Sequence, residues 1–263
     1  MTGTREYTVQ RWDGDGFSFE AEVLADERLI HIILNDQRIT TLLGSDNHVL
    51  ELSRGHLATE YEFDLSVSEH EISVDADERE TFVRIAAPSA PQLAVRPNIV
   101  TSSCGACNQD HYDVAITPSL DFQIIQEPVD HEIILAQLLE LKNHQHAFKR
   151  TGGTHAAGLL YADGTVLVRE DIGRHNAVDK VIGSHLCNTE NPSVIAMLLS
   201  GRCGWDIVVK AARCGIPIIA SMGAASSFAA DTARSNNMTL LTFVRNNRAV
   251  VIGPVEGRLK GKD

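Results

Sequence analysis

Apolar and polar positions divide the chain into two stretches of different texture. Up to about residue 100, short runs that alternate apolar and polar residues predict half-buried strands, at 29–34, 62–67 and 71–74. Beyond residue 128, continuous apolar runs alternate with segments of helical periodicity. Strands are predicted there at 157–161, 165–168, 193–199, 216–220, 239–244 and 249–252, and helices at 130–141, 176–186, 205–213 and 226–236. Such strands are buried on both faces, which predicts an α/β domain with a covered sheet.

A domain boundary is predicted near Pro128. Residues 1–128 form a smaller, β-rich α+β domain, and residues 129–263 form the α/β domain. The net charge of −12 and the absence of a long Lys/Arg run argue against duplex nucleic acid as a partner. No signal-peptide core or membrane-spanning apolar run is present, so the expected compartment is the cytosol.

The pair Cys104-Gly105-Ala106-Cys107 carries the chemistry that the sequence suggests most directly. Three prolines precede it, which places the pair in a loop. A pair at this spacing can form half of a zinc site, cycle as a dithiol, carry a persulfide, or be idle. A zinc site needs two more ligands, and His111 is the one nearby candidate; the signatures of zinc deaminases are missing. The other cysteines, Cys187, Cys203 and Cys214, are expected in or near the core.

Three polar clusters lie where predicted strands begin or end: 151–155 precedes the predicted hairpin, 171–175 opens a helix, and 200–202 follows the strand at 193–199. Open α/β sheets bind ligands beyond the carboxyl ends of their strands, and free N–H groups at helix starts favour anions. His155, Arg174, His175 and Arg202 belong to these clusters. The three clusters together predict a phosphate-binding pocket. The alternative is that they are ordinary turns, which have the same composition.

At these residues the sequence resembles the formate dehydrogenase accessory sulfurtransferases, the FdhD/NarQ family. The resemblance rests on the segments 102–107, 151–157, 200–202, 210–212, 215–218 and 239–248, and above all on the run Gly-Arg-His-Asn-Ala-Val-Asp-Lys at 173–180. It covers roughly residues 27–252 and is weaker before residue 100.

The resemblance implies a homodimer whose C-terminal domain has a three-layer α/β/α, cytidine-deaminase-like fold. It also implies that sulfur passes from a cysteine desulfurase to the bis-molybdopterin guanine dinucleotide cofactor (Mo or W), bound as substrate, before that cofactor enters formate dehydrogenase. No structural metal is implied.

The family's persulfide position corresponds to Cys104, with Cys107 as its partner. The cofactor contacts correspond to Phe243, Val244, Arg245, Asn246, Asn247 and Arg248, and the resemblance favours contacts from His155, Arg174, His175 and Arg202 as well. Asn108 stands where the family usually has Gly, so Cys107 could relay sulfur, protect it or only shape the loop. Two alternatives stay open: a chaperone that binds and delivers the cofactor without transferring sulfur, and a cysteine-gated regulator.

Overall fold

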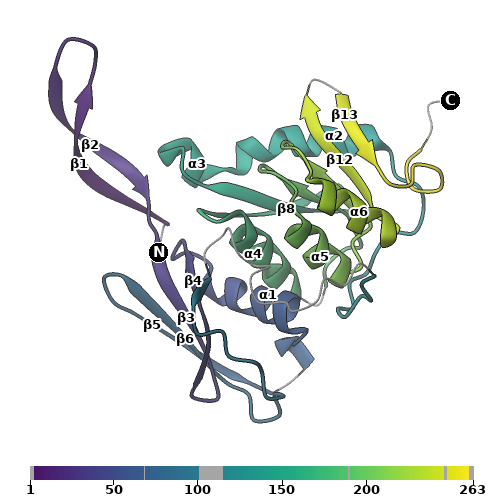
Figure 1. The fold of residues 1–263 in the computed structure, drawn as a ribbon, viewed down its shortest axis with the longest axis horizontal. Coiled ribbons are helices and arrows are strands. Elements are labelled where there is room, and N and C mark those ends of the chain that lie inside the picture. The colour runs from purple at the N-terminus through teal and green to yellow at the C-terminus, as the bar shows by residue number, and fades with distance from the viewer. Residues whose placement is uncertain (1–2, 68, 101–114, 189, 246–247, 261–263) are drawn as a thin grey trace.

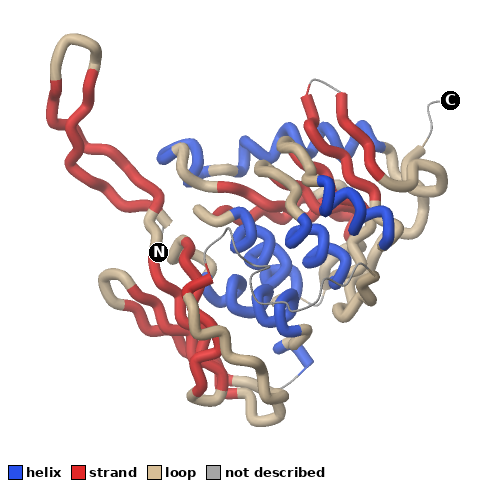
Figure 2. The backbone as a smooth tube through the Cα atoms, viewed as in Figure 1, coloured by secondary structure: helices blue, strands red, loops and turns tan. Residues whose placement is uncertain are grey.

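The computed structural model describes residues 3–67, 69–100, 115–188, 190–245 and 248–260. The chain forms a projecting hairpin, a five-stranded sheet with one long helix, and a larger six-stranded sheet with helices on both faces (Figure 1, Figure 2). The predicted mixed α/β class is therefore confirmed. In the described part of the chain, none of the helices is both long and apolar enough to cross a membrane.

The hairpin consists of β1 (Thr4–Trp12) and β2 (Phe17–Ala25), which pair antiparallel along their whole length. The Asp13 carboxylate closes the turn by accepting the N–H groups of Asp15 and Gly16, both at 3.0 Å. The two strands extend away from the rest of the molecule (Figure 1).

The five-stranded sheet has the order β5-β6-β3-β4-β7. Its strands are β3 (Arg28–Leu34), β4 (Gln37–Gly44), β5 (Glu71–Ala76), β6 (Glu80–Ala86) and β7 (Ile99–Val100). The strands predicted at 29–34 and 71–74 are confirmed. Buried side chains of the sheet, including Ile30, Ile32 and Val83, share one core with Leu52 and Leu57 of α1 (Val49–Tyr61).

The five-stranded sheet and α1 form the N-terminal lobe, and the six-stranded sheet with its helices forms the C-terminal lobe. Two expectations for the N-terminal lobe were wrong. Helix α1 was not predicted, because it is buried on several sides and its apolar residues follow no single stripe. The strand predicted at 62–67 is instead a turn leading into the short 3₁₀ helix Leu65–Val67. Phe63 and Leu65 are buried and produce the alternation, but the Asp64 carboxylate accepts the N–H and O–H of Ser66 and so forms a local turn.

The six-stranded sheet has the order β13-β12-β11-β10-β8-β9. Its strands are β8 (His155–Tyr161), β9 (Val166–Asp171), β10 (Val194–Leu199), β11 (Ile218–Ser221), β12 (Thr239–Arg245) and β13 (Arg248–Ile252). The central strands β10, β11 and β12 run parallel, and the outer pairs are antiparallel. All six predicted strands of this region are present. The carboxyl ends of the parallel strands meet at one edge of the sheet.

Helices cover both faces of this sheet. Met197 of β10 packs in one core with α4 (Arg174–Leu186), α5 (Trp205–Arg213) and α6 (Ser227–Ser235), and its neighbour Leu198 packs in a second core with α2 (His131–Glu140). A 3₁₀ turn (Leu141–His144) and α3 (His146–Thr151) follow α2. The predicted cap of α2 is present, because the Asp130 carboxylate accepts the N–H of Glu132 at 2.9 Å. The likeness to cytidine deaminases and the boundary at residue 128 stay predictions.

Helices α1 and α4 join the two lobes at a close crossing. Gly55 of α1 and Gly183 of α4 face one another, and a Cβ atom added to either glycine would overlap the backbone of the other helix. Two fully buried lysines reinforce the crossing. Lys180 binds the Asp171 carboxylate at 2.6 Å and the Ser45 carbonyl at 3.1 Å.

The second lysine, Lys210, lies between acidic side chains of both lobes. It binds Asp179 of α4 at 2.8 Å and Glu60 of α1 at 2.6 Å. These attractions, working against burial, lower the carboxyl pKa of Asp179 and of Glu60. The charges are paired within the interface, so the position of α1 fixes that of α4.

Candidate functional site

A cavity of about 480 Å³ lies at the carboxyl ends of the parallel strands. Its lining comes from α2, β8, α4, β12 and the turns after β10 and β11, and comprises Leu139, His155, Arg174, Ser200, Gly201, Arg202, Met222, Gly223, Val244 and Arg245. Five residues predicted to contact the cofactor are among them: His155, Arg174, Arg202, Val244 and Arg245. Residues 90 positions apart in the sequence therefore meet where an open α/β sheet is expected to bind a ligand.

Two glycines let the turns after β10 and β11 approach closely. The N–H of Gly223 donates to the carbonyl oxygen of Gly201 at 3.1 Å, and the Ser221 hydroxyl donates to the same oxygen at 2.6 Å. A Cβ atom at Gly223 would lie 2.7 Å from that oxygen, and one at Gly201 would lie 3.2 Å from Nδ1 of His155. Side chains at these positions would force the turns apart or push the His155 ring away.

The cavity is strongly cationic. Three guanidinium groups line it, from Arg174, Arg202 and Arg245, and none of the lining residues carries a carboxylate. Burial lowers the pKa of His155, and the charges of Arg174 and Arg202 lower it further. His155 is therefore neutral at pH 7 and can donate one hydrogen bond while the arginines supply the charge. This combination suits a phosphate-bearing ligand.

The backbone at Phe243 has an unusual conformation. Its φ angle of 57° is in the left-handed region, which is uncommon for a large aromatic residue, and its N–H donates to the Gly223 carbonyl at 2.9 Å. The pairing of β12 with β13 changes register at this point. As a result Val244 and Arg245 both line the cavity, and the Arg245 guanidinium donates to the Met222 carbonyl at 2.6 Å. Strained backbone of this kind concentrates at ligand sites.

The structure does not bring all of the predicted contact residues together. The Phe243 side chain is exposed, and Arg248 is exposed opposite Arg245 in the hairpin; neither lines the cavity. His175 is buried beside α5, where Nε2 of its ring lies against the Asp206 carboxylate. Burial lowers the pKa of His175 against the pull of Asp206. Asn246 and Asn247 lie outside the described residues.

Comparison with known proteins decides the family. The model of the FdhD/NarQ family matches residues 25–256, which is most of the chain. This chain belongs to the FdhD/NarQ family. The sulfur carrier protein FdhD of Corynebacterium efficiens is 35% identical over 246 residues, covering 86% of this chain and 87% of the relative. The sulfur carrier protein FdhD of Sulfolobus acidocaldarius is 33% identical over 236 residues, covering 89% and 90%.

A solved structure extends the comparison to the fold. It is that of a protein assigned as a formate dehydrogenase accessory protein, from Desulfotalea psychrophila. It superposes with a TM-score of 0.71 at 24% identity and covers 97% of this chain and 99% of its own. At that identity the likeness concerns the fold.

The cysteine pair of this FdhD/NarQ protein, Cys104 and Cys107, lies outside the described residues, as does His111. Its three described cysteines have environments that disfavour a thiolate. Cys203 and Cys214 are buried as expected, and burial raises the thiol pKa of both, that of Cys203 to about 12. Cys187 is exposed, which corrects the expectation that it lies in or near the core; it follows the last turn of α4.

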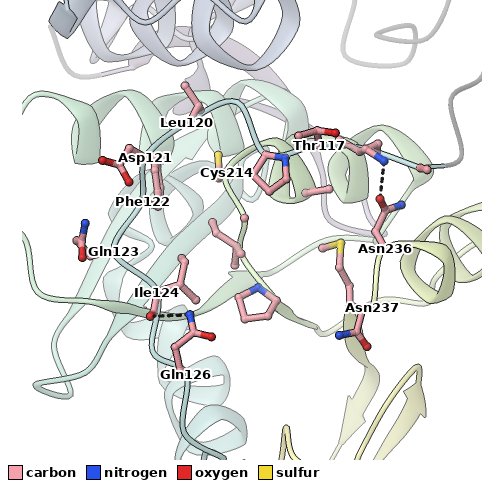
Figure 3. A pocket seen from close by; sticks show the side chains of 18 of the residues that line it. Thr117, Leu120, Asp121, Phe122, Gln123, Ile124, Gln126, Cys214, Asn236 and Asn237 are labelled. Carbon is pink, nitrogen blue, oxygen red and sulfur yellow. Dashed lines mark hydrogen bonds between the residues drawn. The ribbon is translucent and has the colours of Figure 1, made fainter.

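A second cavity, of about 910 Å³, lies at the opposite end of the parallel strands (Figure 3). It is bounded by 115–126, where the described chain resumes after the cysteine pair, and by the residues that precede β11 and β12. Asn236 holds the first part of this segment, since its side-chain oxygen accepts the N–H of Ile116 at 2.6 Å. The lining contains both Asp121 and Arg258. This larger cavity carries charges of both signs, whereas the smaller cavity carries only positive charge. The smaller cavity therefore suits an anionic ligand better.

Three residues of the smaller cavity were missed by sequence reasoning. Met222 and Gly223 follow β11 in the same way that Gly201 and Arg202 follow β10, so the rule that identified 200–202 could have identified them. Leu139 carries no such signal, because it is one apolar residue of α2 among several. Within the described part of the chain, no group of three His, Cys, Asp or Glu side chains is placed to hold a metal ion.

Proposed function

We propose that this protein is a cytosolic sulfur carrier that serves the maturation of formate dehydrogenase. Cys104 receives sulfur from a cysteine desulfurase as a persulfide and passes it to bis-molybdopterin guanine dinucleotide (Mo or W), the bound substrate, before the cofactor enters formate dehydrogenase. The names of the relatives, sulfur carrier protein FdhD, support this reading. The structural observation that carries it is the cavity with three arginines and no carboxylate.

The cavity fits a phosphate-bearing arm of the proposed substrate. Diphosphate groups need several charge-assisted donors, which Arg174, Arg202 and Arg245 supply. The glycines at 201 and 223 let the two turns that line the cavity pack closely against each other. A volume of about 480 Å³ is typical of sites for drug-sized molecules, so we expect it to hold one nucleotide arm and not the whole cofactor.

The loading step is a thiol exchange. The Cys104 thiolate attacks the outer sulfur of a persulfide on the desulfurase, the sulfur–sulfur bond of the donor breaks, and the donor cysteine leaves as a thiolate. Cys104 then carries the outer sulfur. Burial raises the thiol pKa of Cys203 and Cys214, which leaves them poorly suited to this chemistry.

Sulfur loading is tested by intact mass after incubation with a cysteine desulfurase and cysteine. We expect the parent to gain one sulfur atom and Cys104→Ala to gain none and to fail in activating formate dehydrogenase. Cys187→Ala is the matched control, because Cys187 is the exposed cysteine among the described residues. Loading that persists in Cys104→Ala and disappears in Cys187→Ala would contradict the proposal.

The cavity is tested by calorimetry with GDP, a fragment of the proposed substrate. Each charge-assisted hydrogen bond contributes about 1.5–3 kcal/mol, so Arg202→Ala should bind GDP roughly 10- to 100-fold more weakly. Arg258→Ala is the control, because Arg258 lies at the other cavity. Equal losses in both variants would exclude the smaller cavity as the nucleotide site. GDP binding without any sulfur on Cys104 would favour the alternative function, a chaperone that binds and delivers the cofactor.

The proposed function includes a homodimer. Neither the loading test nor the GDP test depends on it.

A further inference from the structure

Strand β12 carries a β-bulge just before Arg245, in the hairpin that it forms with β13 at the edge of the large sheet (Figure 1). Thr242 opposes Val250. The next pair is Arg245 with Arg248, so two residues of β12 lie opposite one residue of β13. The first of the two is Phe243, whose φ angle is 57°. A bulge with left-handed backbone at its first residue usually has glycine there, because glycine has no Cβ atom to clash with the backbone. Phe243 therefore occupies a position that suits glycine.

This conformation is exceptional for a large apolar residue in the described part of the chain. Besides the glycines, the other described residues with a positive φ are all polar: Asn35, Asp36, His48, Glu62 and Asn237. For most L-residues the left-handed region is disfavoured by about 5- to 30-fold. Burial of the ring does not compensate, since the Phe243 side chain is 56% exposed. The surrounding structure must therefore hold the backbone in place.

The bulge determines which face of the sheet Val244 and Arg245 occupy. Alternate residues of a regular strand share a face. Leu241 and Val244 are an odd number of positions apart, yet both belong to the core that contains α2, and Val244 is fully buried there. Without the bulge, Val244 would oppose Arg248 in place of Arg245 and would leave this core. The burial of Val244 thus stabilises the bulge.

The turn after β11 holds the bulge through hydrogen bonds. The N–H of Phe243 donates to the Gly223 carbonyl at 2.9 Å. The Arg245 guanidinium donates to the neighbouring Met222 carbonyl at 2.6 Å. Gly223 also donates its own N–H to the turn that carries Arg202. The backbone of Phe243 therefore sets where Arg245 lies relative to Arg202.

We propose that Phe243 is a positioning residue for the ligand of the smaller cavity: its left-handed backbone, and not its ring, places the Arg245 guanidinium there. The ring centroid lies 5.8 Å from the guanidinium carbon of Arg245, near the limit of a cation–π contact, and an exposed contact of this kind is weak. The bulge holds Arg202 and Arg245 ready for a diphosphate group before the ligand binds. The inference rests on the proposed function, in which this cavity holds one nucleotide arm.

Calorimetry with GDP on Phe243→Gly and Phe243→Ala separates the backbone from the ring. Both variants lack the ring, and they differ only in the Cβ atom that disfavours a φ angle of 57°. Phe243→Gly should bind GDP about 5-fold more tightly than Phe243→Ala. It should also unfold at a higher urea concentration, which reverses the order expected at an ordinary strand position. If the ring made the contact, the two variants would bind GDP equally weakly.

The matched control is the same pair of substitutions at Val250. This residue is exposed in the same hairpin, opposite Thr242, and its φ angle is outside the left-handed region. Val250→Ala should therefore be more stable than Val250→Gly, because glycine weakens a regular strand. Both control variants should bind GDP with the same Kd.

A double variant tests whether Phe243 acts through Arg245. Phe243→Val introduces a β-branched residue, which is poorly suited to left-handed backbone, and should weaken GDP binding roughly 10-fold. Arg245→Ala should weaken it roughly 10- to 100-fold. In the Arg245→Ala background Phe243→Val should cause no further loss, because the contact that it disturbs is already absent. A general structural defect would lower the affinity in both backgrounds.

Three results would overturn the inference: equal GDP binding by Phe243→Gly and Phe243→Ala, parent affinity in Phe243→Val, or additive losses in the double variant. If Phe243→Val does not fold, the comparison of glycine with alanine decides alone. A parent that does not bind GDP would overturn the cavity assignment of the proposed function and this inference with it. A parent that binds GDP without the expected order of variants would overturn this inference alone.

Discussion

Replacing Gly183 by Ala tests whether the crossing of α1 and α4 holds the two lobes together. The added Cβ atom would overlap the carbonyl oxygen of Glu51 and lie 2.7 Å from both the Glu51 carbonyl carbon and the Gly55 nitrogen. All three are backbone atoms of α1, so no side-chain rotation can relieve the clash. The helices must separate, and the buried contacts between Lys210, Asp179 and Glu60 must lengthen with them.

Three effects decide the magnitude. Alanine is favoured over glycine inside a helix by about 1 kcal/mol, which stabilises the variant. Overpacking a rigid site costs about 1–3 kcal/mol, and breaking a buried ion pair costs about 3–5 kcal/mol. If the ion pairs are strained and not lost, the net loss in the free energy of unfolding is roughly 2–4 kcal/mol. For a chain of this size that lowers Tm by roughly 5–15 °C.

Urea unfolding and thermal melting of the parent and Gly183→Ala provide the measurement. The control is Gly16→Ala, the same substitution at a position where nothing lies within 4 Å of the added Cβ atom and the backbone is unstrained. Gly55→Ala should resemble Gly183→Ala, and the double variant should lose less than the sum because one separation of the helices relieves both clashes. A Gly183→Ala protein within about 0.5 kcal/mol of the control would refute the reasoning.

Two further predictions follow from the structure and the sequence. Burial lowers the pKa of His185, which stacks on Phe122, to about 4. His185 therefore stays neutral in the folded chain at pH values below about 6.5, where the unfolded chain binds a proton. The free energy of unfolding should fall as the pH drops from about 6.5 toward 4. His185→Phe should reduce this fall, measured as the difference between the urea midpoints at pH 7 and pH 5. Elemental analysis should find no stoichiometric zinc in the purified protein, and one zinc per chain that is lost in Cys104→Ala would contradict this.

The α/β part of the fold could be predicted because its strands are buried on both faces and its helices carry clear caps or stripes. The continuous apolar run at 193–199 is β10, the central strand, and Asp130 caps α2 as its position suggests. Helix α1 was not predicted because its residues suit contacts with segments distant in the sequence. Gly55 allows the backbone of α4 to pack closely, and His56 is buried against Asp179, 123 residues away. Local pattern carries no information about such contacts.

The cationic cavity was partly predictable for a similar reason. The rule that ligands collect at the carboxyl ends of strands needs only the strand ends, so it identified Arg202. His155 begins β8 and lies at the same edge because β8 runs antiparallel to β10. The rule could not separate Arg174, which lines the cavity, from His175, which is buried against Asp206. Neighbouring residues at a helix start point in different directions, about 100° apart around the axis.

The run 173–180 shows how one short motif serves both the cavity and the frame. Arg174 lines the cavity, whereas Asn176 donates to the Leu43 carbonyl at 2.9 Å, and Lys180 binds Ser45 and Asp171. The Asp179 carboxylate contacts Lys210 of α5 and His56 of α1. One helix therefore presents a cation to the ligand and fastens the N-terminal lobe through buried polar contacts. Because these contacts span both lobes, a displacement of α1 moves α4, and with it the Arg174 guanidinium. The residue types at 173–180 are therefore set by the contacts between the two lobes as much as by contact with a ligand.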